Sequence, residues 1–210
     1  MIKKIITTAF SLGCLMLYSQ SDKSLRLYAN LGSQMSQTKS AFNTDLNDSN
    51  FTSLQVGAGS NYKIGQFIIG TEFYNSKGDL KNNNNKIKYQ EFTTTLYLGY
   101  DFLKSPNFAL ETNLGITLSS KQSILHDLLN QTSSTFQIEQ IGISPSLTFI
   151  KFNKTGTFIG LKAGFNYALN NHNWNNGLDN SKTGYDLNRC SPFIQLNIGG
   201  RIKLPKKQNK

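Results

Sequence analysis

Two histidines, His126 and His172, are the side chains of this sequence best suited to acid–base chemistry. A catalytic triad needs a nucleophile within hydrogen-bond reach of such a base, and an acidic group that orients the base. Each histidine has a serine and an aspartate nearby, but serines are plentiful throughout the chain, so this proximity is expected by chance. We therefore predict no catalytic site and keep an enzyme as the alternative.

The sequence does not favour a metal ion or a cofactor. Apart from Asp127, which is adjacent to His126, no His, Cys or acidic residue stands at metal-site spacing from either histidine. Adjacent residues rarely converge on one metal ion. Gly57 and Gly59 stand inside an alternating segment with no helix after them, so they do not form a phosphate-binding loop. We predict no cofactor.

Two polar regions contain residues suited to binding a partner. The asparagine-rich stretch 170–180 contains His172 and Trp174, and combines amide groups with a ring that we expect to be exposed. The stretch 123–129 contains His126 and is the most apolar part of the regions between strands. It is expected to form either a short helix or an adhesive patch. His126, His172 and Trp174 are therefore the candidate loop-binding residues.

These candidates stand between eight segments in which apolar and polar residues alternate. A period of two predicts strands with one apolar face, and the lengths suit tilted membrane-spanning strands, which need ~9–11 residues. The predicted strands are 24–34, 53–63, 66–75, 89–102, 108–119, 136–151, 157–169 and 192–204. Pro145 cannot donate a ladder hydrogen bond, so it weakens the sixth strand or marks a bulge.

The gaps between these segments alternate strictly between long and short. The long gaps are 35–52, 76–88, 120–135 and 170–191, and the short ones are 64–65, 103–107 and 152–156. This rhythm predicts an all-β fold, an eight-stranded antiparallel up-and-down transmembrane barrel. The long gaps are then extracellular loops, and the N- and C-terminal ends of the barrel domain both lie on the periplasmic side.

The chain begins with a predicted export signal. Lys3 and Lys4 precede an apolar run over 5–18 that is too short to span a bilayer. Cys14 suggests a lipoprotein as an alternative, but the apolar run continues past it, so we assign it to the signal. Cys190 is then left alone and cannot form an intramolecular disulfide. The predicted domains are a signal peptide at 1–21, a barrel domain at 22–204 and a basic tail at 205–210.

The polar face of the predicted strands is rich in Gly, Asn, Ser and Thr, which suit the lumen of a narrow barrel that side chains nearly fill. The few charges on that face have both signs and are Arg26, Glu72, Asp101, Glu111, Lys162 and Arg201. Arg26 and Arg201 lie on the first and last strands, which become neighbours when the barrel closes. We expect Glu72 and Glu111 to neutralise them as part of a structural charge network.

A soluble barrel of lipocalin type is the competing fold. Its exterior would be the polar face and would carry many Lys and Glu for solubility, whereas this polar face carries few charges. A net charge of +10 is typical of proteins that bind nucleic acid. An exported protein rarely meets nucleic acid, so we predict no nucleic-acid partner. Contact with lipopolysaccharide phosphates is a second interpretation of the charge, and a solvated surface is the simplest.

The leader, the eight strands, the short turns and the mixed-sign charges resemble the small outer-membrane barrels of the OmpA/OmpX type, in particular the porin-family outer-membrane β-barrel proteins of Bacteroidota. The resemblance implies the outer membrane of a Gram-negative bacterium, insertion by the barrel-assembly machinery, and contact with outer-membrane lipid and lipopolysaccharide. One departure is that the last strand ends at Leu204 and not at the C-terminal aromatic usual in this class.

The resemblance also implies a structural role, or binding through the extracellular loops, without catalysis. A conducting pore is not expected because side chains fill the lumen of an eight-stranded barrel. The alternatives are an outer-leaflet lipid-modifying enzyme similar to lipid A deacylases, and a soluble periplasmic lipocalin-like carrier.

Overall fold

The computed structural model describes residues 23–39, 50–81, 85–103, 105–127, 130–170, 173–187 and 189–204. The predicted signal peptide and basic tail lie outside these ranges. The strands are β1 (Lys23–Lys39), β2 (Asn50–Ile64), β3 (Phe67–Lys81), β4 (Asn85–Asp101), β5 (Phe108–Asp127), β6 (Thr132–Phe152), β7 (Thr157–Ala168), β8 (Asn173–Asn176), β9 (Lys182–Leu187) and β10 (Cys190–Leu204). In the described part of the chain, no helix is long and apolar enough to cross a membrane.

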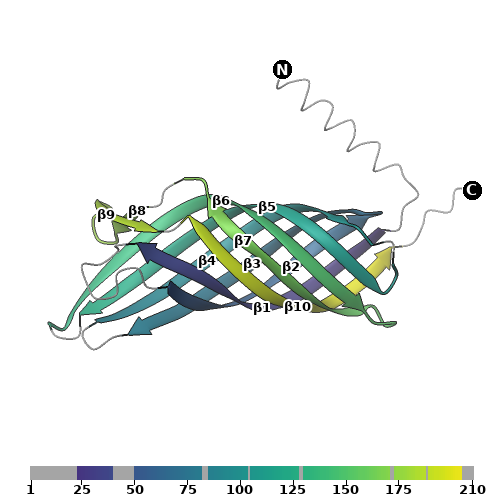
Figure 1. Cartoon of the computed structure of the whole chain (residues 1–210), viewed down its shortest axis with the longest axis horizontal. Helices are drawn as coiled ribbons and strands as arrows, with labels where there is room; N and C mark the ends of the chain where they lie inside the picture. The colour runs from purple at the N-terminus through teal and green to yellow at the C-terminus, as the bar shows by residue number, and fades with distance from the viewer. Residues whose placement is uncertain are drawn as a thin grey trace, which may run out of the picture.

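Eight of the strands close into an antiparallel barrel (Figure 1). Each strand from β1 to β7 pairs with the next, and β10 closes the ring by pairing with both β7 and β1. The eight predicted segments correspond to β1–β7 and β10, so the predicted all-β eight-stranded barrel is confirmed. β1 begins and β10 ends at the same end of the barrel, which also holds the short connections after β2, β4 and β6.

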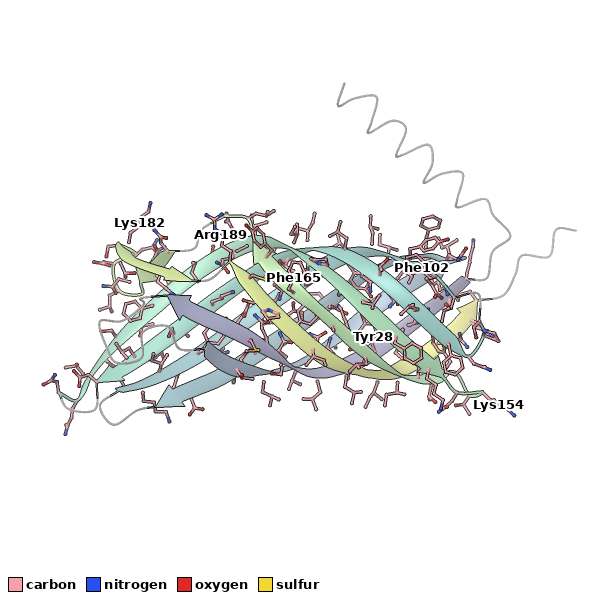
Figure 2. All side chains as sticks on the ribbon, viewed as in Figure 1. Tyr28, Phe102, Lys154, Phe165, Lys182 and Arg189 are labelled. Carbon is pink, nitrogen blue, oxygen red and sulfur yellow. The ribbon has the colours of Figure 1, made fainter. Side chains whose placement is uncertain are left out.

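The two faces of the barrel wall have opposite character. Most outward-facing leucines, isoleucines and phenylalanines of the wall are exposed, from 38% in Phe108 to 64% in Leu98. Figure 2 shows Phe102 projecting from the outside of the wall. The inward face is buried and mostly polar. A soluble carrier would hide its apolar face and expose its polar one, so the lipocalin-like alternative is wrong.

Pro145 interrupts one hydrogen-bonded ladder without shifting the register. β6 pairs continuously with β5 through Leu114↔Pro145. Toward β7, pairing stops after Ile143↔Tyr167 and resumes at Ser146↔Gly164 in the same register. The missing N–H of proline therefore costs ladder contacts on one side, and no bulge forms there.

The strands continue well beyond the predicted ends. β5 and β6 have 20 and 21 residues, and their hairpin stays paired as far as Asp127↔Thr132. The β3–β4 hairpin likewise reaches Lys81↔Lys86. The predictions of loops over 76–88 and 120–135, and of a short helix over the described part of 123–129, are therefore wrong. Period-two alternation persists there with its faces exchanged, apolar inside and polar outside.

The predicted loop 170–191 contains a further hairpin, β8–β9. β8 pairs with β6 at Phe136↔Asn176, and β9 pairs with β1 at Thr38↔Leu187. β7 ends and β10 begins before the wall reaches the end of the barrel that lies opposite the short connections. The β8–β9 hairpin fills the gap that they leave in the wall there (Figure 1). The barrel therefore consists of two stacked rings of eight strands that share β1–β6: one closed by β7 and β10, the other by β8 and β9.

Candidate functional site

Ion pairs cross the polar lumen. Arg26 on β1 donates to Glu111 on β5 over 2.5 Å between Nη1 and Oε1, and Lys162 on β7 donates to Glu72 on β3 over 2.5 Å between Nζ and Oε2. Both pairs are almost fully buried. A lone buried charge is costly because it has lost its hydration, so mutual neutralisation keeps these four side chains compatible with the interior.

Two tyrosines extend the Glu72 pair into a network. The Tyr28 hydroxyl donates to Glu72 over 2.8 Å, and it lies 2.9 Å from the Tyr97 hydroxyl. Glycines make room for these rings: a Cβ on Gly59 would lie 2.5 Å from Cζ of Tyr28, and one on Gly70 would lie 2.5 Å from Cζ of Tyr97. The glycine-rich inward face is therefore required by the packing of the lumen.

Asp101 and Arg201 lie at the periplasmic end of the lumen. Asp101 pairs with Lys63 and accepts the backbone N–H of Leu110 over 3.2 Å, so it fixes the β4–β5 connection. Arg201 is directly opposite Arg26 on the neighbouring strand. The Arg201 guanidinium lies 3.9 Å from the centre of the Phe152 ring.

The expected carboxylate partner of Arg201 is not found among the described residues. Glu111 forms an ion pair with Arg26, and Glu72 forms one with Lys162. Arg201 donates instead to the Pro106 carbonyl over 3.2 Å. The reason is its position at the mouth, where half-exposure reduces the cost of an unpaired charge.

Another charged pair closes the extracellular half of the lumen. Lys121 lies 3.4 Å from Glu91, which also accepts from Tyr89 over 2.6 Å and from Gln34 over 3.0 Å. Lys63, Glu91 and Lys121 are lumen charges that were not predicted from the sequence. Lys63 and Glu91 lie within the predicted strands 53–63 and 89–102, and Lys121 follows the strand 108–119. All three have the inward parity of their strands, and this signal was available.

Above the polar lumen, the interior becomes apolar. Ile87 and Tyr89 of β4, Phe136 and Ile138 of β6, and Trp174 of β8 are all buried, and we call these five residues the apolar plug. Trp174 is 0% exposed, so the prediction of an exposed ring in a loop is wrong. The ring is buried because β8 is part of the upper wall and directs Trp174 inward.

Small voids lie between the polar side chains of the described interior. Two voids of about 10 Å³ each lie beside Lys121 and beside Tyr28. Such a void accommodates about one water molecule. In the described part of the chain, polar side chains therefore pack around these voids.

His126 faces outward at the top of β5, away from Ser123, which is buried. Its Nδ1 lies 2.8 Å from Oγ of Ser133 on β6, a partner that sequence proximity did not suggest. Nε2 of His126 has no hydrogen-bond partner among the described residues. His172 lies outside the described residues. No group of three or more His, Cys, Asp or Glu in the described part of the chain is placed to hold a metal ion.

Asp179 and Ser181, which stand near His172 in sequence, form a turn between β8 and β9. The Ser181 hydroxyl and backbone N–H donate to Asp179 over 2.7 and 3.0 Å. These hydrogen bonds hold the pKa of the Asp179 carboxyl below its ordinary value. Both side chains therefore stabilise the tip of the hairpin.

A closed barrel with an apolar exterior and a polar packed lumen defines a membrane-spanning β-barrel protein. Residues 5–193 match the family described as outer membrane protein beta-barrel domain. The chain belongs to this family and is an integral protein of the outer membrane.

Solved outer-membrane proteins have the same fold. Neisserial surface protein A is 14% identical with a TM-score of 0.50, and the match covers 89% of this chain and 98% of that one. Ail, the attachment invasion locus protein of Yersinia pestis, is 8% identical with a TM-score of 0.53, covering 88% and 100%. OprG from Pseudomonas aeruginosa is 16% identical with a TM-score of 0.53, covering 88% and 97%. At these identities the likeness shows the fold alone. No curated protein sequence matches the chain.

Proposed function

We propose that this barrel acts through its surface, either as a structural component of the outer membrane or by binding through its extracellular end, and not by conduction or catalysis. The observation that carries the proposal is the packed interior. Ion pairs tie opposite walls of the lumen together, and the apolar plug lies above them. A solute would have to break several buried contacts to pass, so a stable open state is unfavourable.

The extracellular end supports a binding role. The paired wall continues beyond the apolar band, and the β8–β9 hairpin completes it. A closed ring positions its outward and upper side chains more firmly than free loops would, because each strand is hydrogen-bonded on both sides. We propose outer-membrane lipid and lipopolysaccharide as contacts of the exterior, the barrel-assembly machinery as the inserting partner, and no nucleic-acid partner.

An outer-leaflet lipid-modifying enzyme is the second candidate, and the His126–Ser133 contact favours it. A serine 2.8 Å from an imidazole nitrogen has the distance of a nucleophile–base pair. Among the described residues, no acidic group contacts Nε2 to orient the ring and stabilise its charged form. We therefore rank this candidate below the non-catalytic role.

Conductance tests the proposal directly. The full-length protein, shown to be folded by its mobility on gels of unboiled and boiled samples, is reconstituted into planar bilayers. We expect no stepwise currents, with a general porin reconstituted in parallel as the positive control. Reproducible openings of the wild-type protein would contradict the sealed lumen.

A complementation experiment separates catalysis from a surface role. A strain lacking the protein is complemented with the wild type or with the double variant His126→Ala/Ser133→Ala, and its lipid A is analysed by mass spectrometry. We expect the same lipid A species in both strains. A species that is present with the wild type and lost with the double variant would establish the enzyme.

A further inference from the structure

A hollow of about 370 Å³ lies on the outer wall of β3, β4 and β5 at the extracellular end. Apart from Gly78 and the buried Tyr89, the residues that line it have the outward parity of their strands: Lys77 and Asp79 on β3, Lys88 and Gln90 on β4, and Gln122 and Ile124 on β5. The hollow therefore opens toward the surroundings of the barrel and not toward its lumen.

The strand register arranges these side chains in rows around the barrel. Lys77 is opposite Gln90, which is opposite Gln122 on the next strand. In the row above, Asp79 is opposite Lys88, which is opposite Ile124. Lys77 and Lys88 are diagonal neighbours, a relation in which Cβ atoms lie within ~7–8 Å and long side chains reach a common point.

The hollow lies immediately above the apolar band. The row below it contains Phe92, which is 51% exposed, and the next row contains Phe73, which is 46% exposed. One row is two residues, or ~7 Å along a strand and ~5 Å along the membrane normal for a strand tilted ~40°. Exposed aromatics mark the edge of the band in such barrels, so Lys77 lies at the level of the lipid headgroups.

The charge of the hollow is positive and only partly neutralised. The Asp79 carboxylate lies 3.4 Å from Lys86, an outward neighbour of Lys88 on β4. Among the described residues, no ion pair involves Lys77 or Lys88, and both are exposed. Two lysines that form no ion pair among the described residues, with the amides of Gln90 and Gln122 beside them, form a set of hydrogen-bond donors for an anion, although the Asp79 carboxylate also lines the hollow.

We infer that this hollow binds a phosphate group of the outer-leaflet glycolipid, lipopolysaccharide, with Lys77 and Lys88 as its cationic ligands. The outward direction and the height select a lipid headgroup over a soluble anion. Ile124, half-buried at the edge of the hollow, offers apolar contact to the lipid. The inference rests on the proposed lipopolysaccharide contact of the exterior. It does not depend on the sealed lumen, so the conductance experiment and this one can fail separately.

Lipid titration of the folded full-length protein tests the inference. The wild type and Lys77→Gln/Lys88→Gln are reconstituted in phosphatidylcholine vesicles that contain increasing amounts of bis-phosphorylated lipid A, and retained lipid A is measured by native mass spectrometry. At ~1 kcal/mol per headgroup lysine, the double variant should bind about 30-fold more weakly than the wild type. Raising the salt concentration should reduce this difference.

The matched control is Lys151→Gln/Lys154→Gln, which removes two exposed lysines at the periplasmic end; Figure 2 shows Lys154 there. It should bind lipid A as the wild type does. Equal binding by Lys77→Gln/Lys88→Gln would overturn the assignment. Equal binding of dephosphorylated lipid A would also overturn it, since that lipid has no phosphate for the hollow to bind. Equal binding of phosphatidylglycerol, whose headgroup has a phosphodiester, would overturn the choice of lipopolysaccharide as the ligand. Displacement of lipid A by equimolar inorganic phosphate would overturn the choice of a lipid ligand.

Discussion

At the scale of single residues, Glu72 is a central anion of the lumen. It is 2% exposed, and accepts from the Tyr28 hydroxyl over 2.8 Å and from Lys162 over 2.5 Å. Lys162 also lies 5.4 Å from the centre of the Tyr97 ring. The carboxylate therefore links strands β1, β3 and β7. Its negative charge offsets the free-energy cost of burying the Lys162 ammonium group.

Glu72→Gln should destabilise the barrel by about 3–5 kcal/mol, because Lys162 would remain buried without a countercharge. The measurement is guanidinium unfolding of the refolded protein in detergent. Asp79→Asn is the control: its pair with Lys86 is 3.4 Å long and exposed, so the change should cost about 0–1 kcal/mol. Similar losses of unfolding free energy in both variants would show that the buried Glu72–Lys162 pair stabilises the barrel no more than the exposed pair does.

Trp174 gives a prediction for the β8–β9 hairpin. Trp174→Ala removes the most buried ring of the apolar plug, so the hairpin should open while the lower ring stays closed. Trypsin should then cut at Lys182, which is exposed on β9 (Figure 2), much faster than in the wild type. Leu178→Ala is the matched control, because Leu178 is 92% exposed in the hairpin turn. Unchanged cleavage of Trp174→Ala would mean that the ring does not hold the hairpin.

At the scale of strands, β4 shows why the barrel extends beyond the membrane. Outward Lys88 and Gln90 give way to outward Phe92 and Leu96, while the inward face changes from apolar Tyr89 to polar side chains. The alternation keeps its period and exchanges its faces between 90 and 92. Where the wall is surrounded by lipid, its apolar face must point outward, and where it is surrounded by water, its apolar face must point inward. The point of exchange therefore marks the extracellular boundary of the membrane.

The boundary predicts opposite effects of one substitution on the same face of β4. Leu96→Arg should destabilise the barrel by about 2–4 kcal/mol, because Leu96 is 59% exposed within the apolar band. Gln90→Arg, above the band, should cost about 0–1 kcal/mol. Unfolding of both variants in phosphatidylcholine vesicles measures the difference. Equal costs would contradict the assigned boundary.

The same exchange explains what the sequence could and could not predict. Alternation predicted the eight membrane-spanning strands, and Glu72, Glu111 and Lys162 were placed on the inward face from parity alone. The upper wall was predicted as loops because outward polar residues such as Lys86 and Lys88 do not fit the apolar outer face of a membrane-spanning strand. Their parity with Ile87 and Tyr89 was the signal that could have extended it.

The β8–β9 hairpin could not be predicted from the sequence for a different reason. Its asparagine-rich segment has low strand propensity, and its partners β6 and β1 are remote along the chain. The pairing forms because β7 and β10 leave a gap in the upper ring, a condition that exists only in the assembled barrel. Trp174 therefore was predicted as an exposed loop residue.

At the scale of the whole molecule, the chain is an outer-membrane barrel of two stacked rings. The lower ring is apolar outside and mostly polar inside, and the upper ring is polar outside and apolar inside. This division gives each ring the exterior that its solvent requires and fills both interiors. The basic hollow over β3–β5 lies where the two rings meet, at the height of the lipid headgroups.

Scanning β4 with a lipid-quenched label tests this account most directly. Single cysteines from Lys86 to Gly99, in a Cys190→Ser background, carry a fluorophore in vesicles that contain brominated lipid. We predict strong quenching at Phe92, Leu96 and Leu98, and little at Lys86, Lys88, Gln90 or any inward position. Quenching that continued unchanged through Lys88, or that occurred at inward positions, would contradict the two-ring barrel and its membrane boundary.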